Sequence, residues 1–202
     1  MSGTVRRVAL TVALACVIAG GAIERPQVDM DARRAMSPVQ RMLGPVASVA
    51  ASFEWVRYRV ALGHGDEARA YGHAARALAL DARTVAGWAT LGDHFIFNRA
   101  SPLEVADPAE RRRWIRAGLD LMRRGEARAA APGDLAHLAA IIRATYLAGI
   151  PDEALGWPGG PAELLREARA DVARAAGHGH PDSSMVLEFI DHRAGELAES
   201  SR

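Results

Sequence analysis

The sequence has 202 residues, half of them apolar and 5% aromatic, with 25 basic and 24 acidic side chains. This length suits one domain and a targeting segment, and the nearly balanced charge argues against a nucleic-acid-binding protein, which usually carries a basic excess. Runs of alternating β-branched and polar residues are missing after residue 25, which excludes a substantial sheet, and Cys16 is the only cysteine, which excludes an internal disulfide.

An apolar segment begins close to the amino terminus. Two arginines precede the sixteen uncharged residues 8–23, and Glu24 and Arg25 follow them. This layout is typical of a signal sequence or signal anchor whose arginines stay in the cytoplasm. We expect residues 1–23 to form an uncleaved single-pass anchor, which would place the rest of the chain on the extracytoplasmic, periplasmic side. A cleaved signal peptide, a lipoprotein modified at Cys16 and a buried cytoplasmic helix are the alternatives.

Residues 24–36 are polar and unpatterned, and we interpret them as a tether. A helical domain is predicted for residues 37–202. It would begin with Ser37 as N-cap and Pro38 in the first helical position, and a Gly-Pro pair at 44–45 would interrupt its first helix. The next helix has apolar residues at steps of three and four, which places them on one stripe. The stripe consists of Val46, Val49, Phe53, Val56 and Val60.

The rest of the chain shows the same alternation of helical patterns and turn signals. Helices are predicted at 67–80, 85–98, 108–124, 135–147, 161–176 and 183–197. Proline-containing loops separate some of them. The fold class is therefore all-α, with about seven helices in antiparallel pairs.

Part of this pattern can be compared with a known repeat. The residues Gly65, Asp66, Ala70, Ala77, Leu78 and Asp81 match the turn and second helix of one unit, and Trp88, Leu91, Gly92 and Phe95 match the first helix of the next. In these positions the chain resembles the tetratricopeptide repeat, over about residues 50–180. The resemblance implies helix pairs stacked as a short superhelix. A plain antiparallel helical bundle would show the same periodicity.

Three longer motifs add a second resemblance. They are Phe-Glu-Trp-Val-Arg at 53–57, Gly-Trp-Ala-Thr-Leu-Gly-Asp-His-Phe-Ile-Phe-Asn at 87–98 and Arg-Arg-Trp-Ile-Arg-Ala-Gly-Leu-Asp-Leu-Met-Arg-Arg-Gly at 112–125. Together with an amino-terminal anchor and a short spacer, they resemble a group of membrane-anchored tetratricopeptide-like bacterial proteins of undefined role. This resemblance implies an architecture and a location, and it implies no activity.

In a superhelix of this kind, the first helices of the units line the concave face. Equivalent positions and the ends of these helices then predict six partner-binding residues, namely Trp55, Arg59, Asp93, Phe97, Arg143 and Tyr146. A mixture of arginine and aromatic side chains suits peptide capture by charge-assisted hydrogen bonds and stacking. The alternative is that Trp55 and Phe97 belong to the core and that Arg59 pairs with Asp93.

Two further clusters of polar residues are candidates for a binding or metal site. The basic stretch 111–124 could touch anionic lipid or an acidic partner, although such a run is more often a solvated helix face. His178 and His180 are a weak metal candidate, with Asp182 and His192 as the only additions, and we predict no metal site.

We therefore predict a non-catalytic protein- or peptide-binding scaffold at the bacterial cell envelope. It would touch the membrane through residues 8–23 and would bind no cofactor, nucleic acid or small-molecule substrate. The alternative is a purely structural bundle that self-associates, for example through residues 183–197. An unrecognised metal-dependent or hydrolytic enzyme is a third reading.

Overall fold

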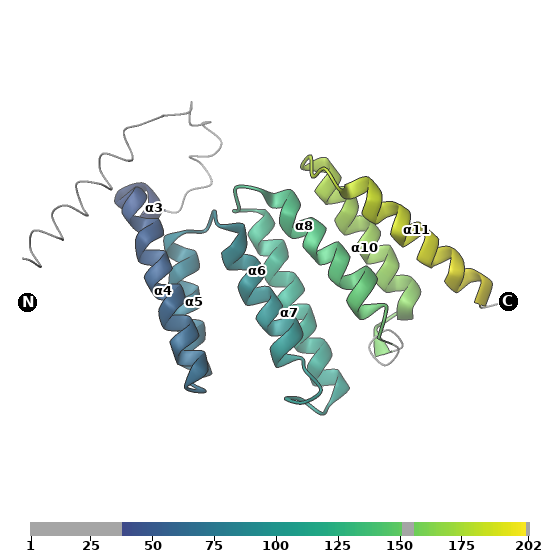
Figure 1. Ribbon diagram of the computed structural model, residues 1–202, viewed down its shortest axis with the longest axis horizontal. Helices are drawn as coiled ribbons and strands as arrows, with labels where there is room; N and C mark the ends of the chain where they lie inside the picture. Colours follow the sequence, from purple (N-terminus) through teal and green to yellow (C-terminus); the bar gives the residue numbers. More distant parts are fainter. Residues whose placement is uncertain (1–37, 151–155, 201–202) are drawn as a thin grey trace, which may run out of the picture. The chain divides into compact units, whose positions relative to one another are not determined.

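The computed structural model describes residues 38–150 and 156–200, and every regular element in these two ranges is a helix (Figure 1). The predicted all-α class is thereby confirmed. The predicted anchor, the tether and the Ser37 cap lie outside the described residues. The chain divides into two compact units, the first ending at Asp81 and the second beginning at Ala82. None of the helices described here combines the length and the apolar character that crossing a membrane requires.

The described part of the first unit holds three helices, α3 (Pro38–Leu43), α4 (Pro45–Gly63) and α5 (Glu67–Leu80). Gly44 separates α3 from α4 with a φ of 54°, a left-handed conformation that favours glycine, and Pro45 then opens α4. The predicted Gly-Pro interruption is thus confirmed. Asp66 caps α5, because its side chain accepts a hydrogen bond of 3.1 Å from the backbone N–H of Arg69.

The α4–α5 pair is held together mainly by small side chains. The buried alanines are Ala47, Ala51 and Ala61 of α4 and Ala70, Ala74 and Ala77 of α5. Alanine has a short side chain and a high helix propensity, so the two helices can approach closely at little entropic cost. Tyr58 adds a large buried ring to this interface, and burial raises its pKa to about 12.

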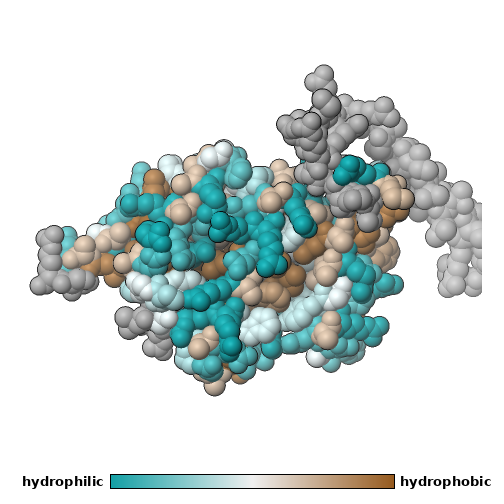
Figure 2. All heavy atoms as spheres, turned by 180° about the vertical axis from the view of Figure 1, so that it is seen from behind, coloured by the Kyte–Doolittle hydropathy of each residue, from teal (hydrophilic) through white to brown (hydrophobic). Residues whose placement is uncertain are grey.

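The predicted apolar stripe of α4 lies on a different face from these alanines. All five of its residues are exposed, from 47% for Val49 to 65% for Phe53. Figure 2 shows hydrophobic surface on the flank of the molecule where α4 lies. The periodicity therefore predicted the helix correctly, but the alanine face is the one that packs on α5.

The described part of the second unit holds α6 (Val85–Asp93), η1 (His94–Arg99), α7 (Pro108–Glu126), α8 (Pro132–Ile141), η2 (Ile142–Leu147), α10 (Gly160–Gly177) and α11 (Ser183–Ser200). The segments η1 and η2 are π-helical and continue α6 and α8 directly. Each of the helices predicted at 85–98 and 135–147 is therefore an α segment followed by a π segment. The helices predicted at 108–124, 161–176 and 183–197 are confirmed, with ends that differ by at most three residues.

Consecutive helices of the second unit pack side by side, α6 with α7, α7 with α8, α8 with α10 and α10 with α11 (Figure 1). The main core cluster consists of Ile96, Ala100, Ile115, Leu119, Met122, Ala139, Ile142, Leu147, Trp157 and Leu164. Gly118 permits the close approach of α6 and α7. A Cβ atom there would lie 2.6 Å from Cγ1 of Ile96 and 2.7 Å from the carbonyl oxygen of Gly92. Any side chain at this position would push the two helices apart.

Candidate functional site

Two of the six predicted partner-binding residues, Trp55 and Arg59, lie on α4 in the first unit. The Trp55 side chain is half-buried, and its ring meets that of Tyr58 edge-on, with centroids 5.4 Å apart. Arg59 is exposed. The other four predicted residues all belong to the second unit.

The rings of Phe97 and Tyr146 contact each other. Phe97 lies in the π segment η1 and Tyr146 in the π segment η2. Their ring centroids lie 4.7 Å apart with an interplanar angle of 69°, a geometry that the aromatic quadrupoles favour. Tyr146 also packs against the main core cluster, whereas Phe97 keeps 39% of its surface exposed. The pair therefore belongs partly to the core and partly to the surface.

Asp93 and Arg143 do not occupy equivalent places in their helices. Asp93 is the last residue of α6, and Arg143 is the second residue of η2. Oδ1 of Asp93 is buried without a hydrogen-bond partner among the described residues, and burial raises the pKa of this carboxyl group. Arg143, by contrast, has two carboxylate partners.

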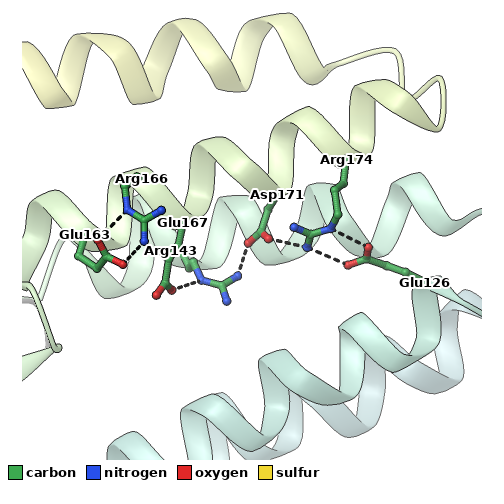
Figure 3. Close-up of polar contacts among 7 residues, drawn as sticks. All are labelled: Glu126, Arg143, Glu163, Arg166, Glu167, Asp171 and Arg174. Atoms are coloured by element: carbon green, nitrogen blue, oxygen red, sulfur yellow. Dashed lines mark hydrogen bonds and ion pairs between the residues drawn. The ribbon is translucent and has the colours of Figure 1, made fainter.

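Arg143 joins η2 to α10 through two carboxylates (Figure 3). Its Nε donates a hydrogen bond of 3.0 Å to Oε2 of Glu167, and its Nη1 donates to Oδ2 of Asp171. Asp171 is only 3% exposed. Contacts of this kind between charged groups are among the stronger hydrogen bonds of a protein and fix the direction of the guanidinium fork.

The same network continues along α10 to α7 (Figure 3). Nη2 of Arg174 donates to Asp171 at 2.6 Å, and Nε and Nη2 of Arg174 donate to the two carboxylate oxygens of Glu126 at 3.0 and 3.2 Å. Hydrogen bonding to Glu126 raises the pKa of Arg174. Burial raises the pKa of Asp171, against the opposing attraction of Arg143 and Arg174. Ion pairs thus join three elements of the second unit, which are η2, α10 and α7.

A pocket of about 340 Å³ opens beside this network, between α7, η2 and α10. It is lined by five arginines, which are Arg116, Arg123, Arg143, Arg166 and Arg174, and we call it the arginine pocket. Asp120, Glu167 and Asp171 supply three carboxylates, and Trp157 supplies an aromatic ring. The lining therefore has more positive than negative side chains.

Two arginines of the arginine pocket have no carboxylate partner among the described residues. Both lie on α7, where Arg116 and Arg123 are exposed. The guanidinium group of Arg116 lies over the ring of Trp157, 5.1 Å from its centroid, in a cation–π arrangement. The donors of both side chains are thus open to an incoming acceptor, while those of Arg143 and Arg174 hold the adjacent wall in place.

The arginine pocket is suited to holding an anionic group. Guanidinium groups present planar pairs of donors that match a carboxylate, and a fixed arginine loses less entropy per hydrogen bond than a lysine. The arrangement can therefore bind and orient an acidic group. None of the described residues that line the pocket is a serine, threonine, cysteine or histidine.

A second polar cluster surrounds Glu54 in the first unit. This cluster was not predicted from the sequence. Oε2 of Glu54 lies 2.7 Å from Nδ1 of His73 and 2.9 Å from Nε of Arg76, and Oε1 accepts from Nη1 of Arg57 at 2.8 Å. The hydrogen bond with His73 is the largest of the effects that lower the pKa of Glu54, to about 2. The cluster ties the buried face of α4 to α5.

The basic stretch on α7 has several separate roles. Arg111 is buried, and its Nη1 donates to backbone carbonyls that include that of Ala106, at 3.1 Å. Trp114 is half-buried between the ring of Phe95, with centroids 5.4 Å apart, and the guanidinium group of Arg99, 5.0 Å from the Trp114 centroid. Only part of this stretch is therefore a freely solvated face.

The structure groups the histidines differently from the sequence. His137 of α8 lies beside His180 and Asp182, with ligand atoms within 4.8 Å of one another, whereas His192 faces Glu196 on its own helix. The two imidazole rings are stacked with centroids 3.9 Å apart. In a tetrahedral zinc site with bonds of about 2 Å, ligand atoms lie roughly 3.3 Å apart, so this group is wider than a formed site.

The sequence singled out Arg143 but missed Trp157 and the special position of Arg116 and Arg123. These two arginines are seven positions apart, so they share one face of α7, and this spacing was the available signal. Trp157 sits in a Gly- and Pro-rich turn, where helical periodicity gives no information about its direction.

No family model matches the chain, and neither the curated proteins nor the solved structures gave a match. Function is therefore argued from the geometry and charge of the site itself.

Proposed function

We propose that this chain is a non-catalytic scaffold that binds an acidic segment of a partner protein in its arginine pocket. The observation that carries the proposal is the pair Arg116 and Arg123. Both guanidinium groups line the pocket without a carboxylate partner among the described residues, and one of them lies over Trp157. Charge-assisted hydrogen bonds would supply the affinity, and the ring would add apolar contact area.

The spacing of the two arginines indicates what kind of segment fits. Seven residues of α-helix place Arg116 and Arg123 about 10 Å apart along α7. In a polyproline II peptide, which has three residues per turn, residues three positions apart lie on the same side and about 9 Å from each other. We therefore expect two acidic side chains, with two residues between them, to be the preferred ligand pattern.

The scaffold that we propose also has the helix stacking and the membrane anchor that the sequence predicts. We infer that the helix pairs stack in the manner of tetratricopeptide repeats, and that residues 8–23 anchor the chain on the extracytoplasmic side of a bacterial membrane. The antiparallel pairing of consecutive helices within each unit and the spacing of the repeat-like residues support the first inference. A scaffold of this kind would assemble or position a membrane-associated complex.

The proposal is tested by peptide selection on the full chain, immobilised in a mild detergent. Random peptides displayed on phage would be selected on the parent chain, on Arg116→Glu/Arg123→Glu, and on Arg113→Glu/Arg124→Glu. The last variant is the matched control, since it changes two exposed arginines of the same helix that do not line the pocket. Circular dichroism checks that all three chains keep their helix content.

We expect peptides with paired aspartates or glutamates to be enriched on the parent and on the control, and to be lost on the pocket variant. Binding of an enriched peptide would weaken steeply with added salt, because the contacts are ionic and near the surface. Equal enrichment on all three chains, or enrichment of peptides without acidic residues, would refute the arginine pocket as the binding site.

A further inference from the structure

The face of α4 that points away from the buried alanines carries five large apolar residues. Val46, Val49, Phe53, Val56 and Val60 follow one another at steps of three, four, three and four, and each is at least 47% exposed. We call this face the α4 seam. Just before it, α3 exposes Met42 at 87% and Leu43 at 43%. Exposed apolar residues usually occur singly on a monomer, so a continuous row points to a covering partner.

The spacing identifies the kind of partner. Steps that average 3.5 residues keep a row of side chains directed at a second helix, and they are the repeat on which coiled coils are built. A helix that packs on a globular core usually has an apolar stripe at least about 100° wide, whereas a strict heptad seam is narrower. The α4 seam is narrow, because Arg57 flanks it on one side and Arg59 on the other.

The residues that flank the α4 seam differ between its two halves. Ala50 and Ser52 are small and flank the amino-terminal half, whereas Arg57 and Arg59 are long and flank the carboxy-terminal half. Two parallel copies would place the arginines of both copies at the same end of the interface, with like charges close together. Two antiparallel copies would lay the arginines of each copy along the small residues of the other, so the side-chain sizes match and the like charges are kept apart.

We infer that the α4 seam is the interface of an antiparallel homodimer of this chain. The exposed apolar surface of the seam, together with Met42 and Leu43, is on the order of 600 Å² per copy, and two copies would bury about 1,200 Å², the lower limit of specific interfaces. The interface is isologous, so each half of one seam covers the opposite half of the other. It lies in the first unit and is independent of the arginine pocket in the second.

Chemical cross-linking of the full chain distinguishes the two directions. Cys16 is first replaced by alanine, and Val46→Cys and Val60→Cys are made separately in that background. In an antiparallel pair, residue 46 lies roughly 15–25 Å from its own counterpart along the helix axis but close to residue 60 of the other copy. A short bismaleimide would then cross-link only the mixture of the two variants. In a parallel pair it would cross-link each variant with itself, and this result would overturn the proposal.

The oligomeric state gives the second readout. Light scattering on the full chain in mild detergent is expected to show a dimer for the parent and a monomer for Val49→Glu/Val56→Glu, with at least a tenfold rise in the dissociation constant. Because both valines are exposed, helix content should stay unchanged. Met185→Glu/Leu187→Glu is the matched control, since it places two glutamates at exposed apolar sites of α11 and should leave the dimer intact.

Three results would overturn the proposal. The first is a monomeric parent at every concentration. The second is a dimer that the α11 control dissociates and the seam variant does not, which would assign self-association to the carboxy-terminal helix. The third is a folded parent that stays monomeric in detergent and binds phosphatidylcholine vesicles through the α4 seam, which would make lipid its occupant.

Discussion

Both units bury a carboxylate among arginines, yet Glu54 in the first unit and Asp171 in the second respond in opposite ways. Glu54 accepts from three side chains, and the pKa of its carboxyl group falls to about 2. Asp171 accepts from Arg143 and Arg174, but burial is the larger effect and raises its pKa. The comparison teaches that a buried carboxylate is stabilised only when its donors outweigh the cost of removing it from water.

The largest expected effect is that of Arg143→Met. Methionine keeps much of the length of arginine but leaves Asp171 buried with one cation fewer, and we expect the free energy of unfolding to fall by about 3 kcal/mol in a urea titration. Because burial raises the pKa of Asp171, protonation removes the charge that Arg174 alone must balance, so the deficit should shrink as the pH is lowered. A deficit that is small at pH 7 or grows in acid would contradict the role given to Arg143.

Glu54→Gln is expected to cost about 2 kcal/mol at pH 7, since it removes charge-assisted hydrogen bonds from a buried position. The folded pKa of Glu54 is about 2 and its ordinary value is 4.5, so the charge stabilises the fold fully above pH 4.5. This stabilisation is lost as the pH falls towards 2, and the difference between parent and variant should vanish over that range. Hydrogen exchange of α4 and α5 reads the effect within the first unit. The exposed substitution Glu188→Gln serves as control and should leave the exchange unchanged.

A smaller effect is expected for Glu126→Gln, about 1 kcal/mol by thermal or urea unfolding. The side chain of Glu126 is 9% exposed and that of its partner Arg174 is 34% exposed, so water replaces part of the lost interaction. Arg174 also keeps its contact with Asp171. A loss as large as that of Arg143→Met would show that the network acts as one cooperative unit and not as separate pairs.

The smallest effect is expected for Arg169→Met, about 0.3 kcal/mol. Arg169 pairs with Asp191 between α10 and α11, but both side chains are more than half exposed. Water and salt screen this pair. The variant is therefore also the matched control for Arg143→Met. It likewise replaces an arginine that forms an ion pair between two helices of the second unit, but at an exposed position.

Local patterns predicted the helices well and their packing poorly. The bounds of α5 were predicted residue for residue, because Asp66 caps its start and its alanine-rich pattern is continuous. The π segments η1 and η2 were predicted as ordinary helix, since a wider turn leaves no mark in the spacing of apolar residues. Similarly, the contact of His137 with His180 and the ion pairs of Arg143 join residues far apart in the chain, and no short-range pattern reports such contacts.

The sequence by itself determined an all-helical chain, the ends of most helices and the presence of an apolar stripe on α4. These features follow from capping, proline and glycine positions and side-chain periodicity, all of which act within a few residues. Only the tertiary structure decided which face of α4 is buried and which arginines stay without a carboxylate. Both outcomes depend on which helices pack together, because burial and charge pairing are properties of neighbours in space and not of neighbours in sequence.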